Sequence, residues 1–442
     1  MPREDLIERV YEFITEEDDD RACDQLSDEA CEEAPRSFVL NATSGGATKL
    51  AESLASPDLV LPWLLGSLGA PLALVGLLNP IRQAGSLAPQ MIVSGAIRRL
   101  PVRKWVWIGG GLAQAACIGA MGAVAWLAPS LGGASAGWMI VGLLAIFSVA
   151  SGVQSVTFKD VLAKTVPKGR RGRLLAARAF LGAGLTLGAG VAIRVLLSED
   201  TEARAFAWPL WIAGALWVLG VALFALIGEK PGHTDGGRSA IREVRKGMGL
   251  LARERGFRRF LATRGLLLAI PLATPFYIVL FRERLGGGLG ALGVFIVATG
   301  VTGLVASPIW GRFADRSSRR VMGVAGLIGG AAAGMALATT LLPEAWRTAP
   351  VLSAVLIINA FAYAGARLGR KTYLVDAAPG DERPLYVASA NTTIGALTIA
   401  GAGLGALGEV IGVEALVVVL GALCLLAAIS AWFTPEAEEM VG

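Results

Sequence analysis

Residues 311–320 read Gly-Arg-Phe-Ala-Asp-Arg-Ser-Ser-Arg-Arg. This stretch is the clearest indication of the fold in the sequence. One apolar run precedes it and another follows, each near the length of about 20 residues that crosses a membrane. The stretch is therefore predicted to be a tight loop between two membrane helices. Gly311 lets neighbouring helices approach, and Asp315 can face a helix N-terminus, whose free N–H groups favour negative charge. Arg319 and Arg320 are predicted to stay in the cytosol, because cytosolic loops are rich in Lys and Arg.

A second, degenerate copy of this loop lies in the first half of the chain. It contains Gly95, Arg103 and Lys104 and stands 216 residues before the stretch at 311–320. Two more pairs of segments match at a spacing of 212 residues, namely 159–167 with 371–379 and Leu185-Thr186 with Leu397-Thr398. Parallel halves are a known feature of one class of secondary transporter. The sequence therefore predicts an internal repeat over residues 57–433.

The loop at 311–320 resembles the loop between helices 8 and 9 of the major facilitator superfamily of secondary transporters, and its copy lies at the equivalent place in the first half. The resemblance implies an all-α membrane protein of twelve transmembrane helices, arranged in two pseudo-symmetric six-helix bundles. It also implies a permease that moves a small solute by alternating access, in which the two bundles rock about a central site.

The composition agrees with a membrane protein. Hydrophobic residues make up 54% of the chain and charged residues 17%, against about 25% charged residues in soluble proteins. The 57 glycines suit closely packed membrane helices. The net charge of +5 does not indicate nucleic-acid binding, because the basic residues lie in loops between apolar runs, where topology explains them.

The apolar runs predict the domain organisation. We expect an acidic tail at 1–56, a six-helix bundle at 57–228, a linker at 229–258, a second bundle at 259–433 and a tail at 434–442. Helix 1 is expected at 59–78 and helix 2 at 80–98, with Asn79 as the cap and Pro80 in the first turn. The Lys and Arg counts of alternate loops place both termini and the linker in the cytoplasm, with the spans in a bacterial inner membrane.

The N-terminal tail contains an unbroken acidic run at 16–20. Disorder is the default expectation for such a segment. Apolar residues at helical spacing over 6–14 leave open a short helix that docks onto a basic cytosolic loop, and the tail could also serve a protein partner.

The charges of the two loops predict a cytosolic gate. In the family, the loop acid faces the first turn of a helix in the opposite half. Asp315 fills that place in the second loop, and its implied target carries Arg173. Arg99 stands where the first loop should have an acid, and its implied target carries Asp381 and Glu382. We expect both loops to latch the halves together in one conformation; alternatively, these charges only follow the topology rule.

The resemblance implies one more contact in the first loop, between Asp160 near the end of helix 4 and Arg103. The second half has Thr372 where Asp160 would map, so this ion pair is expected only once. The predicted gate is completed by the remaining glycines and basic residues of the two loops: Gly95, Lys104, Gly311, Arg316, Arg319 and Arg320.

Polar residues within the predicted spans are candidates for a substrate cavity, because such residues are costly in a membrane. They are Arg82, Gln90, Gln114, Gln154, Arg264, Asn359, Tyr363, Arg367 and Asn391. Asn359, Tyr363 and Arg367 recur every four residues and share one helix face. The alternatives are that the arginines reach a membrane surface and that the amides join helices by hydrogen bonds.

No Asp or Glu is expected deep in a span, whereas proton-driven transporters usually need one. A path lined by bases without a central acid favours an organic anion as the solute, with a coupling ion left open. Multidrug efflux is an alternative within the class. A non-transporting assembly factor or sensor for a membrane complex is an alternative outside it. The loops contain no arrangement of a nucleophile, a base and an orienting group, so an enzyme is not expected. Neither a metal nor a cofactor is expected.

Overall fold

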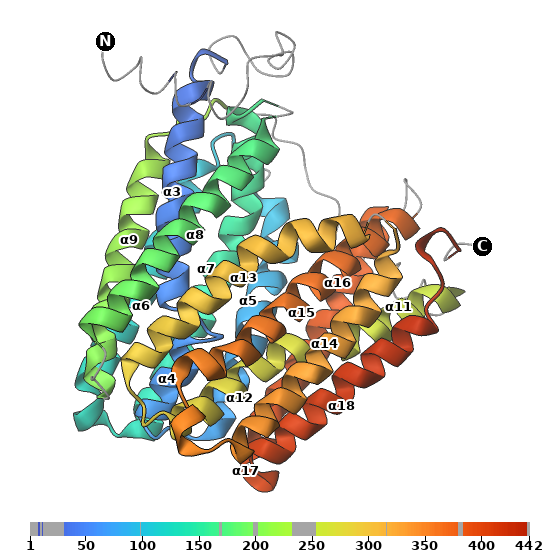
Figure 1. Cartoon of the computed structure of the whole chain (residues 1–442). Coiled ribbons are helices and arrows are strands. Elements are labelled where there is room, and N and C mark those ends of the chain that lie inside the picture. The colour runs from blue at the N-terminus through green and yellow to red at the C-terminus, as the bar shows by residue number, and fades with distance from the viewer. Residues whose placement is uncertain are drawn as a thin grey trace.

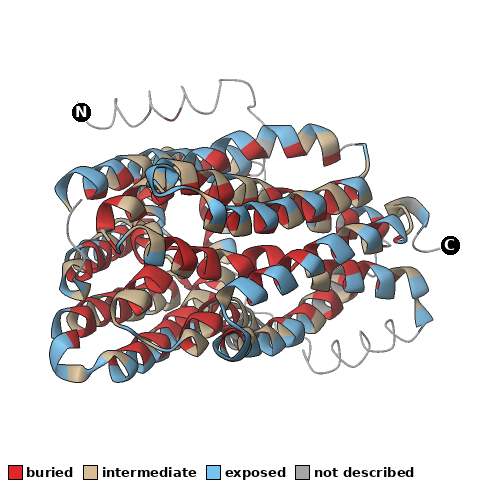
Figure 2. Ribbon diagram, turned by 60° about the horizontal axis from the view of Figure 1, so that its bottom comes forward, coloured by how far each residue is buried: buried red, intermediate tan, exposed pale blue. Residues whose placement is uncertain are grey.

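The computed structural model describes residues 8, 11, 31–97, 99–167, 170–197, 202–231, 253–314, 316–378 and 383–439, and these residues form helices and connecting turns without a β-strand. Ten helical segments, from Lys104–Leu131 to Val413–Trp432, are long and apolar enough to cross a membrane. Figure 2 shows exposed residues on the outer helix faces and buried residues turned toward neighbouring helices. Large apolar side chains such as Phe180, Trp138 and Leu196 are among the exposed ones, as expected where lipid replaces water. The chain is therefore an integral membrane protein.

The helices form two sequential groups (Figure 1). The first half contains α3 (Ala34–Leu54), α4 (Val60–Ser67), α5 (Leu72–Ile97), α6 (Lys104–Leu131), α7 (Gly133–Thr165), α8 (Arg171–Leu196), η1 (Ala203–Phe206) and α9 (Ala207–Ala225). The second half contains α11 (Arg255–Leu266), α12 (Ala269–Arg284), α13 (Leu289–Ala314), α14 (Ser318–Ala338), η2 (Thr339–Leu341), η3 (Glu344–Trp346), α15 (Ala349–Ala377), α16 (Arg383–Ala400), η4 (Gly401–Gly403), α17 (Leu404–Ile411), α18 (Val413–Trp432) and η5 (Ala437–Glu439).

The first half begins earlier than the sequence predicted. Residues 34–54, expected in the polar tail, form α3, which packs against α8 and α9. Helix α4 follows after a short break, and Asn79 and Pro80, expected at a helix start, lie inside α5. The prediction failed because α3 is polar for a membrane helix. Its Ser37, Asn41 and Ser44 are buried against protein. These side chains do not contact lipid, so they can be polar.

Tyr11 belongs to the tail, and it contacts the first bundle. Its ring is buried and lies edge-on to Phe38, with 5.3 Å between ring centroids. The Arg170 guanidinium lies over the ring at 4.9 Å and donates a hydrogen bond to the Tyr11 hydroxyl. Tyr11 therefore docks onto the basic start of α8. The acidic run at 16–20 lies outside the described residues.

The two halves meet toward one end of the molecule. We name this the distal end, which carries residues 67–72 and 284–289; the proximal end carries residues 99–104 and 316–320. Trp63 donates to the Gly287 carbonyl at 3.2 Å, Asn79 donates to the Pro271 carbonyl at 2.8 Å, and the Ala73 amide donates to the Glu409 carboxylate at 3.0 Å. These bonds join helices that belong to opposite halves.

Two pairs of glycines allow this approach. A methyl group on Gly76 of α5 would overlap the backbone nitrogen of Gly405 of α17, and one on Gly293 of α13 would lie 2.5 Å from the carbonyl oxygen of Gly190 of α8. Gly76 and Gly293 are 217 positions apart, and Gly190 and Gly405 are 215 apart, close to the spacing of the loop repeat. The two seams are therefore copies of each other, and each needs glycine because backbones meet there.

Replacing a seam glycine should open the distal end. We predict that Gly76→Val or Gly293→Val costs about 1–3 kcal/mol in the present conformation through overlap, which shifts a two-state population by about 5- to 150-fold. Spin labels at the exposed positions Ser130 and Leu341 should report a longer distance across the distal end by electron–electron resonance. Gly184→Val, where no atom lies within 4 Å of a new methyl group, is the matched control. An equal distance change in all three variants would contradict the prediction.

Candidate functional site

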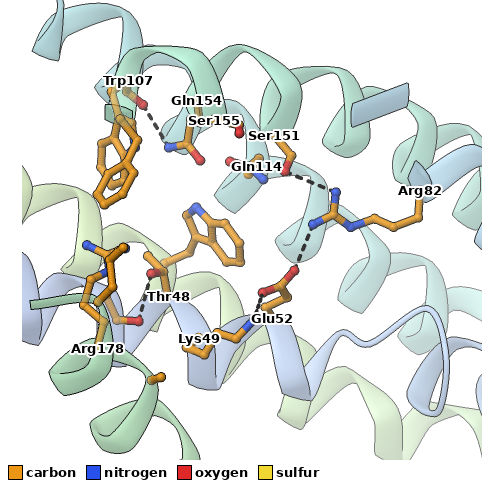
Figure 3. Close-up of a pocket in the computed structure, with 15 residues that line it drawn as sticks. Thr48, Lys49, Glu52, Arg82, Trp107, Gln114, Ser151, Gln154, Ser155 and Arg178 are labelled. Atoms are coloured by element: carbon orange, nitrogen blue, oxygen red, sulfur yellow. Dashed lines mark hydrogen bonds and ion pairs between the residues drawn. The ribbon is translucent and has the colours of Figure 1, made fainter. Parts of the chain in front are cut away.

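A polar cavity of about 340 Å³ lies within the first bundle. Side chains from α3, α5, α6, α7, α8 and α9 surround it (Figure 3). The polar and aromatic residues that line it are Thr48, Lys49, Glu52, Arg82, Trp107, Gln114, Ser151, Gln154, Ser155, Phe158, Arg178 and Trp217. Three of the predicted cavity residues, Arg82, Gln114 and Gln154, therefore meet at one place.

Glu52 forms the charged centre of this cavity. Its carboxylate pairs with Lys49 at 2.8 Å and with Arg82 at 2.8 Å, and Arg82 also donates to the Ser151 hydroxyl at 3.1 Å. Figure 3 shows this chain of contacts from Lys49 to Ser151. The expectation that no acid lies within a span is therefore wrong, since α3 brings Glu52 into the bundle. It was missed because α3 was assigned to the tail.

Two polar atoms of the cavity wall have no partner among the residues that the structure describes. Gln114 Oε1 is an unused acceptor and Trp217 Nε1 an unused donor, and both side chains are buried. Gln154, in contrast, donates to the Trp107 carbonyl at 2.9 Å. Because a buried unsatisfied polar atom costs about 1–3 kcal/mol, the cavity favours a guest that offers both a donor and an acceptor.

Arg178 closes one side of the cavity and is held by protein. It donates to the Asn41 carbonyl at 2.9 Å and to the Asn41 side chain, and it lies over the Phe158 ring at 4.5 Å. Contacts with protein, and not a membrane surface, therefore hold the Arg178 guanidinium. Asn41 belongs to α3, so this contact was also hidden by the assignment of α3 to the tail.

Arg264 forms a separate basic position in the second half. It lies in the last turn of α11, and its side chain is buried, with the residue 8% exposed. One guanidinium nitrogen donates to Asn391 Oδ1 at 2.9 Å, while Nε has no partner. No described carboxylate forms an ion pair with it, and Arg370 lies near enough for the two charges to repel. Arg264 and Asn391 were both predicted, and the structure brings them together.

The predicted polar face of α15 divides into different roles. Asn359 donates to the Ile270 carbonyl at 3.2 Å and to the Thr274 hydroxyl at 2.9 Å, so it joins α15 to α12, which is the packing alternative. Tyr363 is half-buried and Arg367 is exposed. The side chain of Gln90 lies outside the described part of the chain.

The proximal end of the first half is held by Glu229, which follows α9. Its carboxylate accepts the backbone N–H groups of Arg103 at 2.8 Å and Lys104 at 2.6 Å, and it pairs with Lys164 at 2.7 Å. An acid at a helix N-terminus accepts hydrogen bonds from free N–H groups and interacts favourably with the positive end of the helix dipole. Glu229 therefore caps α6. The ion pair expected between Arg103 and Asp160 is present at 3.0 Å; its role in gating stays a prediction.

The second half uses Glu436, which follows α18, in a related way. Glu436 pairs with Arg319 at 2.7 Å and accepts the Ser317 hydroxyl at 3.0 Å. Ser317 in turn caps α14 by accepting the Arg320 amide at 3.2 Å. The sequence analysis missed both Glu229 and Glu436, although each is an acid soon after the last helix of its half.

The predicted latches between the halves are not tested by this structure. Asp315, Asp381 and Glu382 lie outside the described residues. Arg99, Arg173 and Arg316 are exposed, and Lys104 donates to the Ala225 and Ile227 carbonyls within its own half. A methyl group on Gly311 would meet no atom within 4 Å. Among the described residues of the proximal end, each ion pair joins two residues of the same half.

Comparison with known proteins identifies the fold. Residues 272–441 match the model of the Major Facilitator Superfamily. The structure superposes on a mutant of the nucleoside transporter NupG with a TM-score of 0.68 and 11% identity, over 90% of this chain and 99% of that chain. The chain has the fold of the major facilitator superfamily.

Other comparisons agree with this fold. A POT family transporter in complex with 5-aminolevulinic acid gives a TM-score of 0.66 at 11% identity, over 89% of this chain and 95% of that chain. The inward-open xylose transporter XylE from E. coli gives 0.60 at 14% identity, over 90% and 96%. At these identities the likeness concerns the fold alone.

A relative in sequence has no assigned function. It is the uncharacterized protein Rv2209 of Mycobacterium tuberculosis (strain ATCC 25618 / H37Rv), which is 29% identical over 205 residues. The match spans 44% of this chain and 38% of the relative, so the chain covers less than half the length of that protein.

The buried Glu229 should matter more for stability than its counterpart Glu436. We predict that Glu229→Ala costs about 3–5 kcal/mol, because it leaves two backbone N–H groups unpaired and removes the counter-ion of Lys164, which keeps only its hydrogen bond to the Pro101 carbonyl at 2.9 Å. The carboxylate of Glu436 is 33% exposed, so Glu436→Ala should cost about 0–1 kcal/mol. Thermal unfolding of the purified protein in one detergent measures both. Equal losses in the two variants would show that burial does not set the difference.

Proposed function

We propose that the protein is a secondary active transporter that moves a small organic anion by alternating access. The observation that carries the proposal is Arg264, a buried guanidinium whose only hydrogen-bond partner within the described part of the chain is the neutral Asn391. A buried charge without a counter-ion is costly. A transported anion can supply that counter-ion, whereas a cationic solute would add to the repulsion from Arg370.

The cavity of the first half supports a polar solute. Its unused acceptor on Gln114 and unused donor on Trp217 can hold neutral polar groups of the same molecule. The volume of about 340 Å³ lies within the usual range of about 300–1,000 Å³ for small-molecule sites. The reason for proposing an anionic solute is therefore the buried charge of Arg264, and not the absence of an acid from the spans.

Glu52 is our candidate for the coupling group, with a proton as the coupling ion. As a carboxylate it is the shared counter-ion of Lys49 and Arg82. When it is protonated, both cations lose that partner and become available to an anion. Intramembrane acids act in this way in proton relays. Binding of the proton and of the solute would therefore favour each other.

The contacts between the halves fit a rocking motion. Interhalf hydrogen bonds of the described residues gather toward the distal end, while Arg99 is exposed at the proximal end. We propose that the proximal end is cytosolic, with both termini on that side of a bacterial inner membrane, and that the loops at 95–104 and 311–320 latch the halves when the distal end opens.

An anion should stabilise the protein through Arg264. We predict that a thermal-shift screen of inorganic phosphate and of mono-, di- and tricarboxylates finds a stabilising ligand, since a ligand at 100 times its Kd contributes about 2.7 kcal/mol. Arg264→Gln and Asn391→Asp should both abolish the shift, the second because it gives Arg264 an internal counter-ion. Arg284→Gln, at the other end of the same span, should retain it.

The same screen separates the alternatives. Stabilisation by hydrophobic amines alone would contradict the anion and favour multidrug efflux. If no ligand binds, and the full-length chain recovers a membrane partner that depends on residues 1–30, the assembly-factor or sensor function takes precedence.

Loss of Glu52 should uncouple transport from the pH gradient. In proteoliposomes loaded with the anion from that screen, Glu52→Gln should keep anion exchange but lose accumulation driven by an imposed pH gradient. The reason is that Gln keeps hydrogen bonds but cannot release a proton. Glu414→Gln, an exposed acid at the distal end, should behave as wild type. Gradient-driven accumulation that survives in Glu52→Gln would exclude Glu52 as the coupling group.

A further inference from the structure

An apolar groove of about 500 Å³ lies on the outer surface of the second half, between α14 and α18. Figure 1 shows these two helices side by side. Gly323 and Ala428 form its floor, and Leu327, Ile429 and Trp432 form its rim. The rim residues are 54%, 55% and 77% exposed. A groove of this kind exists because the facing residues of the two helices are small, and Gly323 brings α14 close to Ala431.

The proximal end of the groove carries two arginines with different surroundings. Arg319 is occupied, because it pairs with Glu436 at 2.7 Å and donates to the Thr434 carbonyl at 3.1 Å. Arg320 is exposed, and its guanidinium contacts no described carboxylate, while its backbone amide is used in the cap of α14. Among the described residues, Arg320 therefore presents a guanidinium without a counter-ion where the apolar groove reaches the end of the span.

We propose that this groove binds an anionic phospholipid, with an acyl chain between α14 and α18 and the headgroup phosphate at Arg320. Apolar walls hold the chain by van der Waals packing, which is what favours close contact within a membrane. Arg320 selects the charge, since a basic residue at the membrane surface favours an anionic lipid by about 1 kcal/mol. Trp432 lies at the same level, where an indole ring suits the boundary between chain and headgroup.

The groove favours a lipid over a free anion. Inorganic phosphate could use Arg320 but would leave the apolar walls without contact, and a zwitterionic lipid would fill the walls but offer Arg320 a phosphate whose charge its own headgroup cation already balances. An anionic phospholipid satisfies both parts at once. The site is on the outer surface of the second half, away from the cavity in the first bundle, so this proposal does not depend on which solute is transported.

Lipid titration followed by native mass spectrometry tests the site on the full chain. Delipidated protein in detergent is titrated with palmitoyl-oleoyl phosphatidylglycerol or with the phosphatidylcholine of the same chains. We expect the wild type to prefer phosphatidylglycerol. Arg320→Gln should lower its affinity roughly fivefold and lower that of phosphatidylcholine much less, because the net charge of that headgroup is zero. Leu327→Trp, which fills the groove, should weaken both lipids.

Arg312→Gln is the matched control, because Arg312 is also exposed near the proximal end but does not line the groove. It should bind as wild type. Thermal unfolding without added lipid checks that each variant is folded. A preference for phosphatidylglycerol that persists in Arg320→Gln, or that Arg312→Gln removes equally, would overturn the proposal. Competition by inorganic phosphate as strong as by the lipid would also overturn it, since it would mean a free-anion site.

Discussion

A charge in the interior of a membrane protein needs a partner, and Glu52 supplies one to two cations at once. The pair with Lys49 lies within α3, the pair with Arg82 connects α3 to α5, and Ser151 extends the chain to α7. This network lowers the free-energy cost of burying charged side chains, so a polar cavity can exist inside a bundle whose outer faces are apolar. The second half solves the same problem differently. Arg264 donates to a neutral amide and forms no ion pair with a carboxylate of the described residues, so the two halves differ in how far their buried charges are balanced.

The repeat in the chain is most visible where helices begin. Glu229 and Glu436 each follow the last long helix of their half and reach back to the start of α6 and of α14. The first acid binds the backbone directly and is fully buried, while the second works through Ser317 and is partly exposed. The same position in the repeat is thus served by different hydrogen bonds, which is why comparison of residue types alone did not find it.

The sequence predicted what depends on local spacing. The fold class follows from apolar runs and from the loop at 311–320, and the Arg103–Asp160 pair follows from the family pattern. The start of the first half could not be found in this way, because hydropathy detects helices that face lipid, and α3 faces α8 and α9. Glu52 and Lys49 were lost with it. Arg264 and Asn391 were found separately, but their contact spans 127 positions and needs the folded arrangement of α11 and α16.

The glycine seams at Gly76–Gly405 and Gly190–Gly293 have a kinetic consequence. Surfaces that interlock through long side chains must change rotamers to separate, whereas backbones in contact at glycines hold no such barrier. The halves can therefore part at the distal end without repacking at these two points. The speed of the motion would then be set by the polar contacts around the seams, such as those of Trp63 and Asn79. Close packing at this end thus combines a tight seal with easy release.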